Sequence, residues 1–267
     1  MKGTWTVTRR SPLSVHTFTA PEAGWLVNSH VVEFSSQVFV VDAQYTLPLA
    51  REVAEYAAKL GKPVRRLYVT HYHPDHLLGA AAFDVPLYTL PGVADKIAAV
   101  GDRVAAEEHE KVGADIPDQA RRADHLVAEG EETVDGLRMV HLRLREAETE
   151  DALIIAFPDT GIIIVQDLVY HGAHPFFGER RFQTWRAALR EYRQLPYDLI
   201  LPGHGLPGGR ELYDQMLEYV DFVENALAIA KDRTDFKQRL LERFPDYGGV
   251  AVAEHQLRFL FRPATCN

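Results

Sequence analysis

Four histidine and aspartate side chains crowd into six residues of this chain, directly after a predicted strand. The segment reads His71-Tyr72-His73-Pro74-Asp75-His76 and follows the strand-like run of residues 64–70. Before it, residues 37–41 resemble a buried strand, and residues 48–60 carry apolar side chains at helical spacing. Strand, helix and strand in this order predict a βαβ unit, which places the cluster at the carboxyl end of a strand, where α/β proteins build their sites.

The residue types in this cluster predict metal binding. Imidazole and carboxylate groups are ligands for zinc, iron, manganese or cobalt. His71 and His73 can point the same way only from extended or loop backbone, whereas Asp75 and His76 turn in a second direction after Pro74. One loop could therefore offer ligands to two neighbouring ions, the alternative being a polar loop satisfied by its own hydrogen bonds.

Composition narrows the class of protein. The chain has 267 residues, 46% of them hydrophobic and 25% charged, which suits a globular protein with one large core. Its net charge of −9 argues against a nucleic-acid partner, and no apolar run reaches the roughly 20 residues that span a bilayer. The single cysteine, Cys266, excludes a disulfide scaffold within the chain. We expect a cytoplasmic protein with no nucleic-acid or membrane partner.

The rest of the chain is predicted to alternate between strands and helices. The predicted strands span residues 25–34, 85–90, 153–157, 162–165 and 199–201, with a hairpin at 133–144, and the predicted helices span residues 91–100, 185–195, 211–231 and 236–244. Residues 101–128 are predicted as helix and loop of undefined role. We expect one α/β domain over residues 1–225 and a helical extension over residues 226–267 packed on it. Cover for the site and a homodimer contact are open alternatives for this extension.

Three segments together resemble the metallo-β-lactamase fold superfamily. The string from His71 to His76 looks like the HxHxDH signature of that family, and it follows the βαβ unit that the family requires. Ile164-Val165-Gln166-Asp167 is similar to the strand that ends in a metal-bridging aspartate, and Leu201-Pro202-Gly203-His204-Gly205 resembles the loop that supplies the last histidine ligand. The resemblance spans roughly residues 25–225. It implies a four-layer αββα sandwich, here with a C-terminal helical extension.

One position departs from the family pattern. A histidine is expected about nineteen residues before the bridging aspartate, but Glu146-Ala147-Glu148-Thr149 occupies that turn. Counting from Pro158 and Asp167 places Glu148 where the histidine would be, and some branches of the superfamily, alkylsulfatase-like enzymes among them, use glutamate there. Glu146 and Glu150 are the fallback candidates. A solvated loop carboxylate is the alternative interpretation.

The resemblance implies a site for two divalent metal ions. His71, His73 and Glu148 would hold the first ion; Asp75, His76 and His204 would hold the second, and Asp167 would bridge them. Zinc is the first expectation, with manganese or iron as alternatives because the glutamate adds a harder donor. A bridging hydroxide would then attack the substrate.

The implied activity is hydrolysis of a small ester, lactone or thioester. Asp75 and Tyr170 are the predicted catalytic residues, and Tyr170 occupies the position at which lactonase-like members contact a substrate oxygen. His171, His174, Trp25 and Tyr72 are candidates for the pocket wall. A mononuclear iron oxygenase of the persulfide-dioxygenase type and a non-catalytic metal-binding module are the alternative functions.

Overall fold

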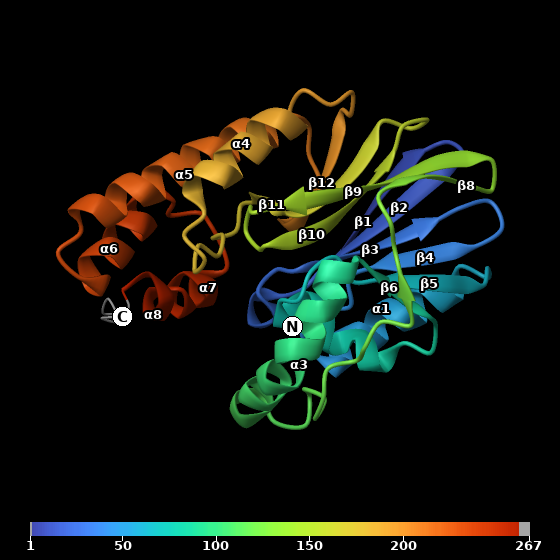
Figure 1. The fold of residues 1–267 in the computed structure, drawn as a ribbon, viewed down its shortest axis with the longest axis horizontal. Helices are drawn as coiled ribbons and strands as arrows, with labels where there is room; N and C mark the ends of the chain where they lie inside the picture. Colours follow the sequence, from blue (N-terminus) through green and yellow to red (C-terminus); the bar gives the residue numbers. More distant parts are fainter. Residues whose placement is uncertain (1, 262–267) are drawn as a thin grey trace.

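Two β-sheets packed face to face form the centre of the protein, as Figure 1 shows for the computed structural model, which describes residues 2–261. The first sheet has the order β1-β2-β3-β4-β5-β6-β7, antiparallel from β1 to β4 and parallel from β4 to β7. Its strands are β1 Thr4–Arg10, β2 Leu13–Thr19, β3 Asn28–Glu33, β4 Val38–Val41, β5 Val64–Tyr68, β6 Leu87–Thr89 and β7 His125–Leu126.

The second sheet has the order β12-β11-β10-β9-β8, in which only β11 and β12 are parallel. Its strands are β8 Gly130–Val134, β9 Leu137–Arg145, β10 Asp151–Phe157, β11 Ile162–His171 and β12 Leu199–Gly205. The last two strands supply the predicted aspartate and the last predicted histidine of the site.

Helices cover the outer face of each sheet and complete four layers (Figure 1). The helix α1 packs on the first sheet, while α4 and α5 pack on the second. The helices are α1 Leu47–Lys59, α2 Pro74–Leu77, α3 Pro91–Val112, α4 Phe182–Tyr192, α5 Glu211–Ile229, α6 Arg233–Arg243, α7 Val250–His255 and α8 Leu257–Leu260, with short 3-10 turns η1 Glu22–Gly24 and η2 Leu78–Ala82. The predicted αββα sandwich with C-terminal helices is confirmed.

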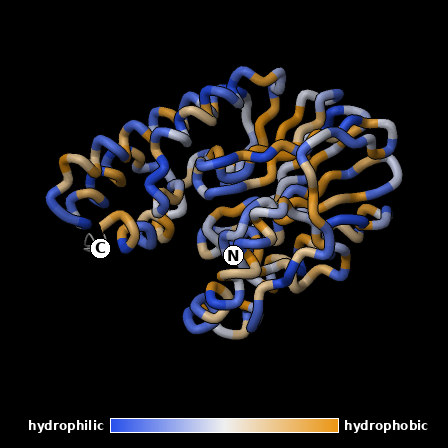
Figure 2. Tube along the Cα trace, in the orientation of Figure 1, coloured by the Kyte–Doolittle hydropathy of each residue, from blue (hydrophilic) through white to orange (hydrophobic). Residues whose placement is uncertain are grey.

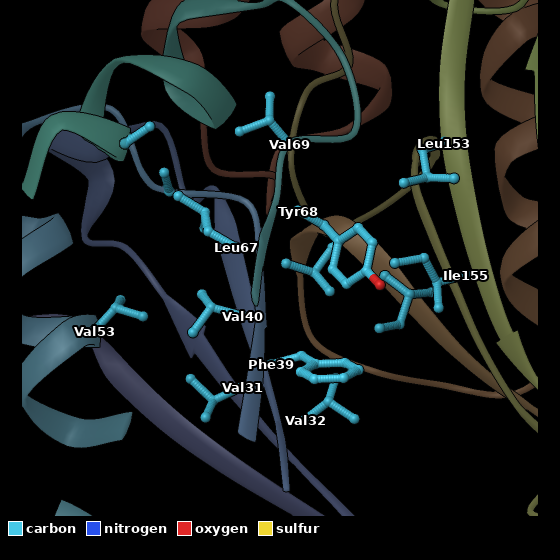
Figure 3. Close-up of a cluster of buried hydrophobic side chains, with 14 of the residues drawn as sticks. Val31, Val32, Phe39, Val40, Val53, Leu67, Tyr68, Val69, Leu153 and Ile155 are labelled. Atoms are coloured by element: carbon cyan, nitrogen blue, oxygen red, sulfur yellow. The ribbon is translucent and has the colours of Figure 1, made fainter. Parts of the chain in front are cut away.

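The middle strands β3 and β4 of the first sheet are buried on both faces: successive side chains point to opposite faces, and both faces are covered (Figure 3). One face carries Val31, Val40 and Leu67 toward Val53 of α1, and the opposite face packs Phe39 and its neighbours against the second sheet. This double burial explains the continuous apolar runs of β4, and Figure 2 shows the same concentration of hydrophobic segments in the strands.

Several regions differ from the prediction, and three of them bear on the fold and the site. Residues 4–19 form the antiparallel pair β1 and β2, which the polar composition of this segment concealed, although Val15 and Phe18 are fully buried. The helix α3 continues to Val112 rather than stopping at residue 100, because Ala105 and other residues of one face remain buried. The strand β11 continues to His171, past the predicted end at residue 165.

The C-terminal helices share an apolar cluster with α5. This helix runs through residues 225 and 226 without a break, and Phe236, Leu240, Ala253 and Leu260 pack into the same apolar cluster. The end of the extension, including Cys266, lies outside the described residues. Over residues 2–261, no helix combines the length and the apolar character needed to cross a bilayer.

Candidate metal centre

The structure brings all seven predicted metal-ligating side chains together at one edge of the two sheets. His71 follows β5, His73 caps the N-terminus of α2, and Asp75 and His76 lie on that short helix. The other three come from the second sheet: Glu148 from the β9–β10 loop, Asp167 from β11 and His204 from β12. Every one of the seven except His73 is at most 5% exposed.

The first donor set consists of His71, His73 and Glu148, with Asp167 beside them. Their donor atoms all lie within 4.8 Å of one another. Nδ1 of His73 is 2.9 Å from Oε1 of Glu148, and Nε2 of His71 is 3.7 Å from Oε2 of the same carboxylate. Donors of a tetrahedral ion with bonds of about 2.1 Å are separated by about 3.4 Å, so this spacing suits a metal.

The second donor set consists of Asp75, His76 and His204. Oδ2 of Asp75 lies 3.3 Å from Nε2 of His204 and 3.6 Å from Nε2 of His76. Asp167 connects this set to the first. Its Oδ1 is 3.2 Å from Nε2 of His76, and its Oδ2 is 3.5 Å from Nε2 of His204 and 3.7 Å from Nε2 of His71. Asp167 therefore has the position of a shared ligand.

Several buried polar atoms of the two donor sets lack hydrogen-bond partners in the described part of the chain, as expected of residues that bind a metal ion. Nε2 of His71, His76 and His204, Oε2 of Glu148 and Oδ1 of Asp167 are buried, and none makes a hydrogen bond of acceptable geometry to any of residues 2–261. A buried polar atom left without a partner costs about 1–3 kcal/mol. Five such atoms facing one space therefore fit a bound cation.

Each of the three histidines is oriented by its other ring nitrogen. Nδ1 of His76 lies 2.7 Å from Oδ2 of Asp42, and Nδ1 of His204 lies 2.8 Å from the carbonyl oxygen of Trp25. The Thr70 hydroxyl donates to Asp42, so it can accept from Nδ1 of His71 at 3.1 Å. In every case Nε2 keeps its lone pair toward the centre, which is the arrangement of metal-binding imidazoles.

Sequence reasoning missed the residues behind these ligands. The fully buried carboxylate of Asp42 accepts from the backbone N–H and hydroxyl of Thr70 and from the amide of Gln166. The Asn28 amide donates to the carbonyl oxygens of Pro202 and Gly205, on either side of His204. The position of Asp42 at the end of an apolar strand was the only signal in the sequence.

The structure distinguishes among the three glutamates of the β9–β10 loop. The Glu148 side chain is 3% exposed and points into the cluster. Glu146 and Glu150 are 55% and 54% exposed, and both form ion pairs with Arg181, at 3.2 and 3.6 Å. The flanking carboxylates therefore face away from the donor sets, which leaves Glu148 as the candidate ligand.

Unusual backbone conformations surround the cluster. Trp25, Asp42, Glu146 and Gln166 all have positive φ values, between 43° and 62°, although none is glycine. Such conformations cost of order 1 kcal/mol each and concentrate at functional sites. Gly203 shows a related constraint, because a Cβ atom there would overlap Oδ1 of Asp167.

Tyr170 lies against the second donor set. Its ring stacks on His204 with centroids 4.5 Å apart, and its hydroxyl donates a hydrogen bond to Oδ2 of Asp167. Burial, reinforced by the negative charge of Asp167, raises the pKa of Tyr170 well above its ordinary value. The hydroxyl therefore keeps its proton and remains a donor.

Burial and neighbouring charges shift the pKa values of the carboxylates and histidines in the cluster. Burial raises the pKa of Glu148 to about 7, against the opposing effect of His73. Burial alone would raise the pKa of Asp75, but His76 and His204 lower it to about 2. Burial alone would lower the pKa of His204, but Asp167 and Asp75 raise it to about 9. Opposed shifts of this kind are characteristic of functional sites.

The cluster forms the floor of a cavity of about 540 Å³, a size that suits a small molecule. Trp25, Tyr72 and Tyr170 line it, as the sequence predicted for the first two. His171 and His174 do not. His171 bonds the carbonyl oxygen of Leu206, and His174 is buried against the Tyr219 hydroxyl, with its pKa lowered by burial to about 4.

Comparison with known proteins decides the family. Residues 23–204 match the family model described as the Metallo-beta-lactamase superfamily. The chain belongs to this superfamily. Proteins of the metallo-β-lactamase superfamily are mostly metal-dependent hydrolases, and the histidine and carboxylate clusters of this member agree with the use of divalent metal ions.

One curated relative is the linear primary-alkylsulfatase of Pseudomonas sp. (strain ATCC 19151), which is 24% identical over 245 residues. The match covers 76% of this chain and 46% of the sulfatase, so the chain spans about half the length of that relative.

Solved metallo-β-lactamases share the fold. The enzyme from Pontibacter korlensis matches with a TM-score of 0.61 and 19% identity over 82% of this chain and 99% of its own. FIM-1 from Pseudomonas aeruginosa, solved in its mono-zinc form, matches with a TM-score of 0.62 and 20% identity over 83% and 96%. At these identities the likeness establishes the fold alone.

Proposed function

We propose that this member of the superfamily hydrolyses a small ester, lactone or thioester with two divalent metal ions. The observation that carries the proposal is the meeting of two donor sets at Asp167, on the floor of a cavity that fits a small molecule. His71, His73 and Glu148 would hold one ion, and Asp75, His76 and His204 the other. Bound there, the ions would polarise the scissile carbonyl and make water nucleophilic at neutral pH.

The chain's own residues would orient the reaction. Asp75 lines the cavity, and its carboxylate lies beside His76 and His204, where it would accept a hydrogen bond from the attacking water and orient it. Tyr170 also lines the cavity, and its hydroxyl, which bonds Oδ2 of Asp167, would turn to donate a hydrogen bond to the oxygen that gains charge. Trp25 and Phe176 would exclude water from the apolar part of the substrate.

A sulfate ester is the second candidate substrate. The likeness to a linear primary-alkylsulfatase favours it, and an alkyl chain would suit the aromatic residues of the cavity wall. A mononuclear iron oxygenase has less support, because Asp75, His76 and His204 are all present and face the centre as a second donor set. A binding module without catalysis predicts metal uptake and no turnover.

The first test is metal content. The protein is purified, loaded with zinc, manganese or iron(II) and analysed for its elements, as wild type, Glu148→Ala and Glu146→Ala. We expect two ions per wild-type chain, a loss toward one in Glu148→Ala, and no change in Glu146→Ala, whose carboxylate faces Arg181 instead. One iron per chain, unaffected by Glu148→Ala, would overturn the dinuclear proposal.

The second test is turnover. The metal-loaded forms are supplied with ester, lactone, thioester and primary alkyl sulfate substrates, and oxygen uptake is recorded with a thiol persulfide. Hydrolysis of any carboxylic substrate supports the proposal, and hydrolysis of alkyl sulfates alone selects the second candidate. Oxygen uptake without hydrolysis would select the oxygenase. Two bound ions without turnover of any substrate would select the non-catalytic binding module.

A further inference from the structure

The C-terminal helices bring an arginine to the wall of the cavity. Val252 and His255 of α7 and Arg258 and Phe259 of α8 line the same cavity as the donor sets, together with residues of α3. Figure 1 shows the ribbons of α7 and α8 across from α3. The extension therefore does more than pack against α5. It completes the wall of the cavity with side chains that come from outside the two sheets.

Arg258 differs from the other charged groups of this wall. Outside the donor sets, each of the others has an ion-pair partner: Lys96 with Glu150, Arg103 with Glu107, Glu108 with Lys111, and Glu179 with Arg181. No carboxylate of residues 2–261 forms an ion pair with Arg258. The wall thus carries one positive charge that the described part of the chain leaves without a counter-charge.

Two neighbours fix the direction of this guanidinium. It stacks over the Phe259 ring at 4.7 Å from the centroid, and one of its N–H groups donates to Nε2 of His255 at 2.8 Å. Burial, followed by the charge of Arg258, lowers the pKa of His255 to about 4, so the imidazole is neutral at pH 7 and accepts this bond. A held arginine presents its remaining donors in a fixed fork, which suits a planar carboxylate.

Aromatic rings line the path from the donor sets to Arg258. Phe176 lies 5.4 Å from the His73 ring and 5.4 Å from the Phe259 ring, and Trp25 lies 5.9 Å from the His255 ring, all measured between centroids. A ligand crossing this cavity meets the candidate metal centre at one end, an apolar middle and a positive charge at the other end.

We propose that Arg258 determines specificity by binding a terminal carboxylate of the substrate, whose ester or thioester group lies at the metal centre. The preferred substrate class is then a monoester of an aliphatic dicarboxylic acid, with the methylene chain between the aromatic rings. This proposal rests on the proposed hydrolase function for the position of the reacting group.

The test compares matched substrates that differ only at the far end of the acyl chain. The zinc-loaded protein hydrolyses 4-nitrophenyl monoesters of succinic, adipic and suberic acid and the 4-nitrophenyl esters of butanoic, hexanoic and octanoic acid. Variants are Arg258→Gln and Arg258→Lys. The control is Arg243→Gln, because Arg243 also stacks on the following phenylalanine but lies outside this cavity.

We expect the carboxylate-terminated ester to be preferred at one chain length, by about three- to tenfold in kcat/KM, as for an exposed charged hydrogen bond. Arg258→Gln removes the preference through KM with kcat unchanged, Arg258→Lys keeps part of it, and Arg243→Gln keeps all of it. Equal losses for both ester series in Arg258→Gln, or no preference at any chain length in wild type, would overturn the proposal.

A binding measurement separates this proposal from the hydrolase proposal. Calorimetry records the affinity of the zinc-loaded protein for suberate and for octanoate, which differ only in the second carboxylate. Tighter binding of suberate that Arg258→Gln abolishes would support the role of Arg258 even where no ester is hydrolysed. Equal affinities for the two acids would overturn it even where esters are hydrolysed.

Discussion

The carboxylate of Asp42 lies 2.7 Å from Nδ1 of His76 and holds the ring so that Nε2 faces Asp167. Asp42 directly follows β4, and His76 lies on α2 after β5, so the contact joins segments that follow two neighbouring parallel strands. The bonds from Thr70 fix Asp42 in turn. The first sheet thus positions Asp42, and Asp42 orients the His76 ring in the candidate metal centre.

Replacing Asp42 should therefore weaken metal binding without removing a ligand. In Asp42→Ala we expect metal affinity to fall by about 10- to 100-fold, the usual effect of losing the partner of a ligating histidine. Competition with a chromophoric chelator measures it, with Asp246→Ala as an exposed control. An unchanged affinity in a folded Asp42→Ala protein would contradict this role.

Gly203→Ala should disturb the position that Asp167 occupies between the two donor sets. The added Cβ would overlap Oδ1 of Asp167, so either that carboxylate or the end of β12 that carries His204 must move. We expect a lower metal content by elemental analysis and a loss of stability of about 1–3 kcal/mol, typical of an overpacked site. Gly209→Ala is the control, because the atoms nearest to its Cβ would belong to the flexible Glu211 side chain. Equal effects of the two substitutions would refute the explanation.

The sequence was sufficient for the parts of the site that depend on local order. The histidine string follows β5 as the βαβ pattern predicted, and the spacing of the resembled family pointed to Glu148, the glutamate that the structure turns inward. The reason is that strand ends and short turns are set by neighbouring residues.

The sequence was insufficient wherever distant segments meet. Asp42 looked like the end of a strand, and nothing local linked it to His76 or Gln166. The strands β1 and β2 look polar because they are rich in threonine. Such side chains can be buried because they form hydrogen bonds with distant residues, as Thr17 does with His30. The position of Arg258 depends on how α7 and α8 fold back over the cavity, which no periodicity specifies.

Arg181 should stabilise the loop that carries Glu148. It is 15% exposed and forms ion pairs with Glu146 and Glu150, the two residues that flank the inward-facing glutamate. In Arg181→Gln we expect faster hydrogen exchange in the β9–β10 loop and a loss of metal affinity smaller than in Glu148→Ala. Arg180→Gln is the control, since Arg180 has no ion pair with residues 2–261. A loop that exchanges at the wild-type rate in Arg181→Gln would show that the ion pairs do not restrain it.

Asp135 should make stability depend on acid pH. It lies in the β8–β9 turn of the second sheet and accepts hydrogen bonds from Ser35, Ser36 and Gln37, in the β3–β4 turn of the first. Burial alone would raise the pKa of Asp135, but the Ser36 N–H and the side chains of Gln37, Ser36 and Ser35 lower it to about 2.

Because the pKa is lower in the folded state, the ionised carboxylate stabilises the fold above the ordinary aspartate pKa of about 4, and this contribution is lost as the pH falls through about 2. Asp135→Asn tolerates the same positive φ of 50° and removes the charge. We expect it to lower the free energy of unfolding by at most about 1 kcal/mol at pH 7, less than the full pKa shift corresponds to, because water screens this exposed turn, and the difference from wild type to shrink between pH 4 and about 2. Urea unfolding at several pH values measures both effects. A difference in unfolding free energy that stays constant down to pH 2 would mean that the charge of Asp135 does not stabilise the contact between the two sheets.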